Sequence, residues 1–324
     1  MVSIKDLFSG YATSLHEEPP HLTLNKKLII NVAPTGSFTS RQQNPYQPYT
    51  MEENIRAAVE SYRAGAAVWH VHARDDDGMP SKDPAVMRET IDRVRAECPD
   101  IVTSVIPYVD YNAPGVSQVS RCVDYMVKAG PHYMETAVLI CTTGSFSEKF
   151  TYTVTSSILT DIVNYLEERG VKPEFQGHSY QALKDTYDWI LARDLASAPA
   201  LLNVMLGFHG YSHASPVGPD PWNYIYLMAM QGTLPSGAVH GICAGGRNWL
   251  PFANMAILLG FDMVRVGMED SVYLHPHRDD KIRRCAETVE RVVAIAKALG
   301  REIATPEVAR QIMGLKPMHA QVPA

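Results

Sequence analysis

The chain has 324 residues, of which 46% are hydrophobic, so it can bury the core of one large domain or of two ordinary domains. Its formal net charge of -6 disfavours a nucleic-acid-binding protein, because such proteins usually present a basic surface. The sequence shows no signal-peptide pattern and no apolar run of about 18 residues, so we expect a cytoplasmic protein that binds neither membranes nor nucleic acids.

The cysteines do not follow a disulfide or zinc-knuckle pattern. There are five of them, widely spaced and without a Cys-x-x-Cys motif: Cys98, Cys122, Cys141, Cys243 and Cys285. An odd number with such spacing favours free thiols in a reducing compartment.

Short apolar runs alternate with helical patterns along most of the chain, and each run predicts a strand. The predicted strands are residues 28–33, 67–72, 101–106, 133–139, 172–176, 201–206, 238–243 and 263–267. Strands that alternate with helices pair in parallel through crossover connections, and eight such units in about 250 residues are typical of a (β/α)₈ barrel.

Capping signals mark several of the intervening helices. Thr50 and Glu53 form a capping box that begins a helix ending at Gly65. Asp83 and the proline after it begin the next helix. Near the C-terminus, residues 279–299 carry a long amphipathic helix, and a shorter helix capped by residues 305–307 follows.

A doubly wound open sheet is the alternative fold, but residues 33–37 (APTGS) lack the glycine-rich phosphate loop that usually follows its first strand. We therefore expect a single TIM-barrel catalytic domain over residues 26–324, with helices at its C-terminus. Residues 1–25 form an N-terminal extension that packs on the barrel or is partly loose.

His70 and His72 are the strongest candidates for a metal site. They lie two positions apart in a predicted strand, so their side chains point to the same face. They also lie at the C-terminal end of that strand, where barrel enzymes place their chemistry. Two imidazoles placed in this way favour a divalent cation such as zinc.

A catalytic zinc site needs a third protein ligand, which the last predicted strand supplies. Glu269 and Asp270 follow that strand, so one carboxylate can bind the metal while the other acts as a base. Arg265 points into the barrel and can hold a carboxylate in place. His275 and His277 repeat the spacing of the first histidine pair, but a proline separates them in a polar loop, so we expect them at the surface.

These two motifs resemble those of the β-keto acid cleavage enzymes, whose best-known type is the 3-keto-5-aminohexanoate cleavage enzyme. The similar segments are residues 69–75 (WHVHARD), 264–270 (VRVGMED), 171–174, 290–293 and 300–306. The resemblance covers roughly residues 27–317. It implies a (β/α)₈ barrel with zinc, or another divalent metal, bound by His70, His72 and Glu269.

The resemblance also implies the reaction. A β-keto acid reacts with acetyl-CoA, the co-substrate, to give acetoacetate and a new acyl-CoA, and an Arg265–Asp270 pair acts as general base. A homotetramer or homodimer is implied as well. No phosphate loop for CoA stands out in the sequence, and Arg247 is a candidate contact.

The expected substrate pocket departs from the 3-keto-5-aminohexanoate type. Where that type has Gly-Ala-Glu, Ser-Thr-Gly-Gly, a threonine and Glu-x-Glu, this chain has residues 36–38 (GSF), 106–109 (IPYV), Val138 and residues 174–176 (EFQ). The substrate-contacting positions are then Phe38, Ile106, Tyr108, Val138, Gln176 and His178. Each change removes a charge or hydroxyl group, so we expect a substrate that is more apolar, aromatic or differently anchored.

Two other functions fit part of the pattern. Amidohydrolases are metal barrels that also use histidines after the fifth and sixth strands and a late aspartate, which His178, His209 and Asp270 would supply. However, their His-x-His pair lies on the first strand, and Glu269 would have no role. A non-catalytic metal-binding barrel is the third reading, and the presence of Asp270 and Arg265 argues against it.

Overall fold

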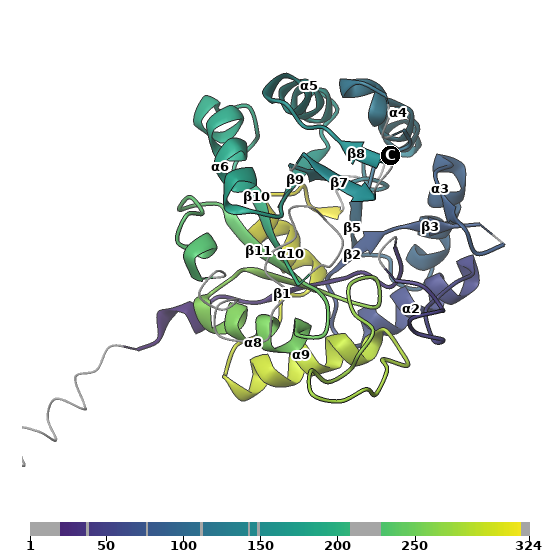
Figure 1. Ribbon diagram of the computed structural model, residues 1–324, viewed down its shortest axis with the longest axis vertical. Helices are drawn as coiled ribbons and strands as arrows, with labels where there is room; N and C mark the ends of the chain where they lie inside the picture. The colour runs from purple at the N-terminus through teal and green to yellow at the C-terminus, as the bar shows by residue number, and fades with distance from the viewer. Residues whose placement is uncertain are drawn as a thin grey trace, which may run out of the picture.

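The computed structural model describes residues 20–36, 39–75, 77–110, 113–141, 143–147, 150–207 and 228–318. Its centre is a closed barrel of parallel strands in the order β1-β12-β11-β10-β9-β6-β5-β2, with helices around the outside (Figure 1). The predicted (β/α)₈ barrel is therefore confirmed, and the doubly wound sheet is wrong because the strands close into a ring.

The barrel strands are short and almost entirely buried. They are β1 Ile29–Val32, β2 Val68–Val71, β5 Val102–Val105, β6 Thr136–Ile140, β9 Lys172–Gly177, β10 Leu201–Leu206, β11 Val239–Ala244 and β12 Met263–Val266. The fourth predicted strand began too early, at residue 133. Tyr133 instead closes a turn in which its N–H donates to the carbonyl of Gly130, and the strand begins only at Thr136.

The remaining elements surround this ring. The helices are α2 Met51–Arg63, α3 Pro84–Arg95, α4 Ser120–Ala129, α5 Ser156–Glu167, α6 Tyr180–Trp189, α8 Trp249–Leu259, α9 Ala286–Ala298 and α10 Pro306–Met313. Three 3₁₀ turns are η1 Leu22–Asn25, η2 Gly115–Gln118 and η3 Leu191–Arg193. Two small antiparallel sheets pair β3 Ala73–Arg74 with β4 Pro80–Ser81, and β7 Gly144–Ser147 with β8 Phe150–Tyr152.

Most helix signals lie where the sequence predicts them. Thr50 and Glu53 form the capping box of α2, and Asp83 caps α3. Thr305 caps α10. Helix α9 begins at residue 286 rather than near 279, because residues 279–285 stay with the loop that follows β12. There the N–H of Ile282 donates to the carbonyl of Val272.

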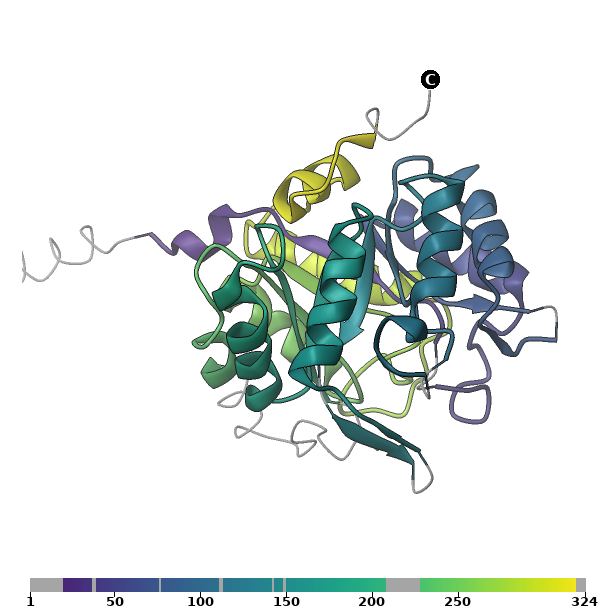
Figure 2. The ribbon, with the colours of Figure 1, turned by 90° about the horizontal axis from the view of Figure 1, so that it is seen from above.

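Helix α10 closes the N-terminal end of the barrel, opposite the end where the β7–β8 hairpin projects (Figure 2). Its Ala309 and Met313 pack on apolar side chains from the bottoms of several strands, which are Ile29, Val68, Val102, Leu201, Val239 and Met263. Burial of this apolar layer holds the base of the barrel dry, so chemistry is confined to the opposite end.

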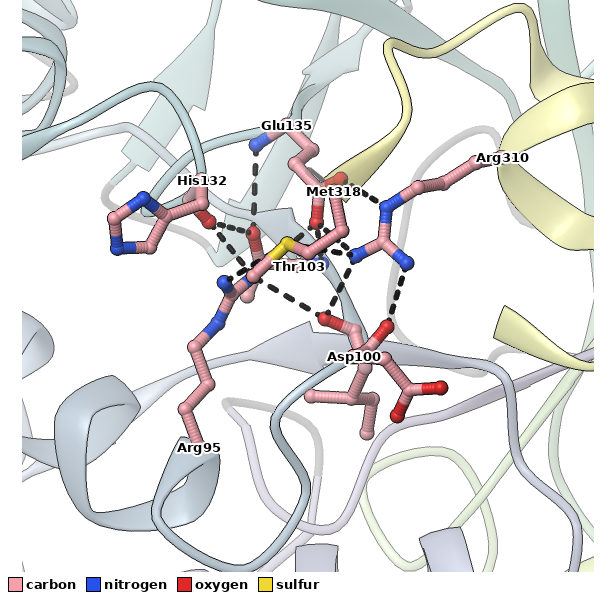
Figure 3. Close-up of polar contacts among 8 residues, drawn as sticks. Arg95, Asp100, Thr103, His132, Glu135, Arg310 and Met318 are labelled. Carbon is pink, nitrogen blue, oxygen red and sulfur yellow. Dashed lines mark hydrogen bonds and ion pairs between the residues drawn. The ribbon is translucent and has the colours of Figure 1, made fainter. Parts of the chain in front are cut away.

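A buried ion cluster fixes α10 in this place (Figure 3). Glu135, just before β6, accepts from Nε of Arg310 at 2.7 Å and from Arg95 of α3 at 3.2 Å. Both arginines also donate to the carbonyl of Ile101. The cluster joins three segments that are far apart in the sequence.

The five cysteines are all buried and free, as expected from their spacing. Within the ranges described above, no helix has the length and apolarity needed to cross a membrane.

Candidate active site

His70, in β2, and His72, directly after it, meet at the C-terminal mouth of the barrel. Nε2 of His70 lies 3.1 Å from Nε2 of His72, and the two rings are nearly perpendicular. Helix α2 holds this strand end, because Asn54 donates from Nδ2 to the carbonyl of His72 at 2.8 Å. The spacing of two residues therefore does bring both imidazoles to one point.

Glu269 completes the cluster from the loop after β12. Its Oε1 lies 3.2 Å from Nε2 of His72, and its Oε2 lies 3.7 Å from Nε2 of His70. The three ligand atoms all lie within 4.8 Å of one another. The carboxylate also fills the space beside Gly36, where a Cβ would lie only 2.0 Å from Cδ of Glu269.

Arg265 holds both carboxylates of the adjacent loop. Its Nε and Nη2 donate to Oδ2 and Oδ1 of Asp270 at 3.0 and 2.8 Å. Its Nη2 also lies 2.9 Å from Oε2 of Glu269. The adjacent carboxylates thus have separate positions: Glu269 faces the two histidines, and Asp270 forms a two-point pair with the guanidinium.

Burial and neighbouring charges set the protonation of these groups. Burial, with Arg265 nearby, lowers the pKa of His70 well below its usual value, so this imidazole is neutral and can bind a cation. Burial opposes ionisation of Glu269, but His72 and Arg265 lower its pKa overall. Burial raises the pKa of Asp270 to about 6, despite the guanidinium beside it.

Arg74 organises the loop that lies behind Glu269. It is buried and donates from Nε to the hydroxyl of Thr35 at 2.6 Å and from Nη2 to the carbonyl of Gly36 at 2.9 Å. A third bond from Nη1 reaches the carbonyl of Gly78. Arg74 therefore fixes the backbone against which the Glu269 carboxylate packs.

A layer of polar side chains fills the barrel beneath the mouth, and the sequence reasoning missed it. Glu174 accepts from the hydroxyls of Ser104 and Thr136 at 2.7 and 2.8 Å and from Nδ2 of Asn203 at 2.6 Å. In the sequence, these polar residues interrupt mostly apolar strands, and this interruption could have indicated a polar layer inside the barrel. Through these hydrogen bonds, the layer holds the Glu174 carboxylate in a fixed position inside the barrel.

Comparison with known proteins places the chain in a family. The model of the beta-keto acid cleavage enzymes matches residues 27–315. The chain belongs to the β-keto acid cleavage enzyme family. Two 3-keto-5-aminohexanoate cleavage enzymes, from Fusobacterium nucleatum and Acetoanaerobium sticklandii, are each 33% identical to it, over 90% of this chain and 99% of theirs. A 3,5-dioxohexanoate:acetyl-CoA acetone transferase of Paraburkholderia graminis is 27% identical over 91% of this chain and 98% of its own.

Solved structures share the fold. ObcA, in a ternary complex with a C4-CoA adduct and oxalate, has a TM-score of 0.66 at 20% identity and matches 84% of this chain and 68% of its own. A type I 3-dehydroquinate dehydratase from Clostridium difficile has a TM-score of 0.54 at 10% identity, with 86% of this chain and 94% of its own matched. At these identities, the similarity supports the barrel alone.

Three of the predicted pocket residues of this β-keto acid cleavage enzyme, Ile106, Tyr108 and Gln176, line a cavity or face the inside of the barrel. Ile106 and Tyr108 line a small cavity of about 70 Å³ together with His72. The Tyr108 hydroxyl is directed to β6, where it accepts from the N–H of Ile140 at 3.1 Å. Gln176, two residues beyond Glu174 on β9, shares the inward face of that strand, and its Nε2 is buried.

The other predicted positions are buried in the barrel, paired at the surface or outside the described residues. Val138 is fully buried in β6, and His178 is buried just after β9. The guanidinium of Arg247 donates to the carbonyl of Arg278 and to Asp279, so its contact with CoA stays a prediction. His277 is exposed, as expected for the second His-x-His motif, whereas His275 is half-buried and pairs with Asp280. Phe38 and His209 lie outside the described residues.

The amidohydrolase alternative is disfavoured. The candidate metal group among the described residues consists of His70, His72 and Glu269. In an amidohydrolase Glu269 would have no role, whereas here it is the carboxylate that faces both histidines. Membership of the β-keto acid cleavage family supports the same conclusion.

Proposed function

We propose that this chain transfers the acyl group of a β-keto acid to CoA. The acid reacts with acetyl-CoA, and the products are acetoacetate and a new acyl-CoA. The observation that carries the proposal is the pairing of a His₂Glu cluster with a separately held carboxylate, Asp270, at the mouth of a barrel of this family.

The cluster fits a divalent cation such as zinc. Two neutral imidazoles and one carboxylate are a donor set of catalytic zinc sites, in which an open position remains for substrate. His70 is neutral and Glu269 is ionised, as ligands must be. A cation bound there would act as a Lewis acid on the keto oxygen of the substrate.

Asp270 then serves as the general base. It accepts a proton from the α-carbon of the β-keto acid, while Arg265 keeps its two oxygens in a fixed orientation. A carboxyl whose pKa is raised to about 6 is still ionised at neutral pH and holds the proton better than an exposed aspartate does.

The remaining steps form one carbon–carbon bond, break another, and return the proton. The α-carbon forms a bond to the acetyl carbonyl carbon, and the CoA thiolate leaves the acetyl group for the keto carbon of the original acid. The bond between that keto carbon and the α-carbon then breaks. Asp270 returns its proton to the α-carbon, and acetoacetate leaves with a new acyl-CoA beside it.

We propose that the substrate does not carry the amino group found in the 3-keto-5-amino type. Gln176 and Val138 place an amide and an aliphatic group where a carboxylate and a hydroxyl are expected in that type. The names of the relatives already cover an amino acid and a dioxo acid, so the family accommodates different substituents. A homodimer or homotetramer is part of the proposal, as is a single catalytic domain over residues 26–324.

Metal analysis combined with an acetyl-CoA-dependent assay over a panel of β-keto acids tests the proposal. We expect about one zinc or similar ion per chain, and acetoacetate formed in equal amount with a new acyl-CoA. The panel should include amino, alkyl, aryl and dicarboxylic acids. Hydrolysis of the β-keto acid without CoA would contradict the proposed reaction. Turnover of the amino-substituted β-keto acid alone would contradict the proposal that the substrate lacks the amino group.

A further inference from the structure

A groove lies on the outer rim of the barrel mouth, beside the proposed reaction centre. It has a volume of about 350 Å³ and runs between the β1–α2 loop and the loop that joins β12 to α9. Figure 1 shows α2 and α9 as neighbours on this side of the barrel. Tyr46, Arg56, Met268, Arg283 and Arg284 are among the residues that line it.

The groove has an excess of unused positive charge. In the described part of the chain, Arg56 and Arg283 have no carboxylate partner, and both are exposed. Arg284 lies 3.2 Å from Glu290 and 4.0 Å from Glu60. The guanidinium of Arg283 instead lies over the ring of Tyr46, at 5.8 Å from its centroid.

The two acidic side chains that line the groove, Glu53 and Glu60, pair with Arg41 and Arg284 and not with Arg56 or Arg283. Glu53 accepts two hydrogen bonds from Arg41 and one each from the backbone N–H groups of Tyr49 and Thr50. Its carboxylate is therefore committed to the helix cap. Tyr46 adds an aromatic face that is 48% exposed. Guanidinium groups without a carboxylate partner can bind phosphate, and an exposed aromatic ring beside them can stack on a base.

One wall of the groove is continuous in sequence with the reaction centre. Met268, in its wall, directly precedes Glu269, and the hydroxyl of Thr39 donates to the Met268 carbonyl. In (β/α)₈ barrels, the loop after the eighth strand is a frequent site of phosphate binding. A ligand anchored here can extend a flexible arm over the rim to the metal cluster.

We propose that this groove binds the phosphorylated adenosine of acetyl-CoA. Arg56 and Arg283 hold its phosphate groups, and the adenine takes the place of the Arg283 guanidinium over the ring of Tyr46. The pantetheine arm then carries the thioester to Asp270 and the metal ligands. This inference rests on the proposed function, because it takes CoA as the co-substrate.

Binding of three probes to the intact protein tests the assignment directly: CoA, 3′-dephospho-CoA and pantetheine. We expect calorimetry to show affinity decreasing in that order. Arg56→Ala and Arg283→Ala should each weaken CoA binding about tenfold, which corresponds to about 1.4 kcal/mol. Neither should alter pantetheine binding. Arg121→Ala is the matched control, because Arg121 is an exposed arginine on α4, with 70% of its side chain accessible.

Steady-state kinetics give a second readout. In the arginine variants, KM for acetyl-CoA should rise with little change in kcat, whereas kinetics with S-acetylpantetheine should be unchanged. Unaltered CoA affinity in both variants would overturn the assignment. So would dissociation of the oligomer in these variants, measured by light scattering, because the arginines would then belong to an interface.

Failure of this inference can be separated from failure of the proposed reaction. If wild-type protein prefers CoA to pantetheine through these arginines but converts no β-keto acid, the groove stands and the reaction is wrong. If acetoacetate forms but the arginine variants bind CoA as the wild type does, the reaction stands and the groove is wrong.

Discussion

At the scale of single residues, Gly36 decides where the Glu269 carboxylate can lie. A methyl group at this position would lie 2.0 Å from Cδ of Glu269, far inside van der Waals contact. Since Arg74 holds the backbone of Gly36, the carboxylate and not the loop must move. The absence of a side chain at Gly36 therefore determines where the proposed third metal ligand lies.

We predict that Gly36→Ala lowers zinc affinity at least tenfold, because Glu269 is displaced from the two histidines. Competition with a chromogenic chelator measures this affinity. Gly232→Ala is the control, since its added methyl group would meet neighbours at no less than 3.5 Å. Equal affinities in the two variants would disprove the positional role of Gly36.

Substitutions of the two adjacent carboxylates should have different effects on metal content and turnover. Asp270→Asn should keep the metal and lower kcat by about 10²- to 10⁴-fold, because it removes only the base. Glu269→Gln should instead lose metal, since a neutral amide is a poor ligand for zinc. Metal content by mass spectrometry and turnover of the best β-keto acid distinguish these outcomes, and metal loss in the Asp270 variant would reverse the assignment.

At the scale of elements, α10 depends on the charges beneath it. Glu135 is buried between Arg310 and Arg95, so its removal leaves two guanidinium groups without a counter-charge. We expect Glu135→Leu to destabilise the protein by about 3–5 kcal/mol in urea unfolding. The double variant Glu135→Leu/Arg310→Met should recover part of that loss, because one unpaired charge is removed as well.

An exposed ion pair provides the comparison. Arg63 and Glu97 link α2 to the segment after α3, with side chains 63% and 53% exposed. Solvent screens such a pair, so Arg63→Ala should cost no more than about 1 kcal/mol. If the Glu135 variant were no less stable than this one, the cluster would not be what holds α10.

The elements also show what the sequence could predict. Most barrel strands are short apolar runs, and burial on both faces makes such runs visible without any knowledge of the fold. Strand β9 (Lys172–Gly177) is the exception, because its inward side chains are the polar Glu174 and Gln176. The false start of the fourth strand has a physical cause: Tyr133 and Met134 are buried, but in a turn below the barrel. Hydrophobicity reports burial and does not report backbone direction.

Part of the candidate site could also be predicted from the sequence, and part could not. The spacing of His70 and His72 fixes a shared face, so their convergence could be predicted from strand geometry alone. The choice between Glu269 and Asp270 could not be predicted from strand geometry, because it depends on the space left by Gly36 after β1 and on the orientation of the Arg265 guanidinium. Arg74 is part of the same motif as the histidines, yet its three bonds reach backbone and hydroxyl groups that no local pattern identifies.

At the scale of the whole molecule, the candidate metal cluster joins distant parts of the chain. His70 lies in the second strand of the barrel, His72 directly follows it, and Glu269 follows the last strand, so a cation bound there would tie β2 to β12 across β1. A ligand that binds only the folded state stabilises that state, by about 4 kcal/mol when its concentration is a thousand times Kd.

We therefore predict that chelation lowers the melting temperature of the holoprotein by roughly 8–16 °C, at about 2–4 °C per kcal/mol. Differential scanning fluorimetry with and without added zinc measures the shift. His72→Ala should melt at a temperature that zinc no longer affects. A zinc-dependent shift that persists in this variant would place the ion elsewhere.

The five buried cysteines have a practical consequence. Burial raises the pKa of every one of these thiols, so none is a ready thiolate in the folded protein. We expect native protein to be almost inert to maleimide reagents. A cysteine introduced at an exposed position, as in Arg121→Cys, would then be the one site that takes a fluorophore, which gives a singly labelled molecule for fluorescence measurements.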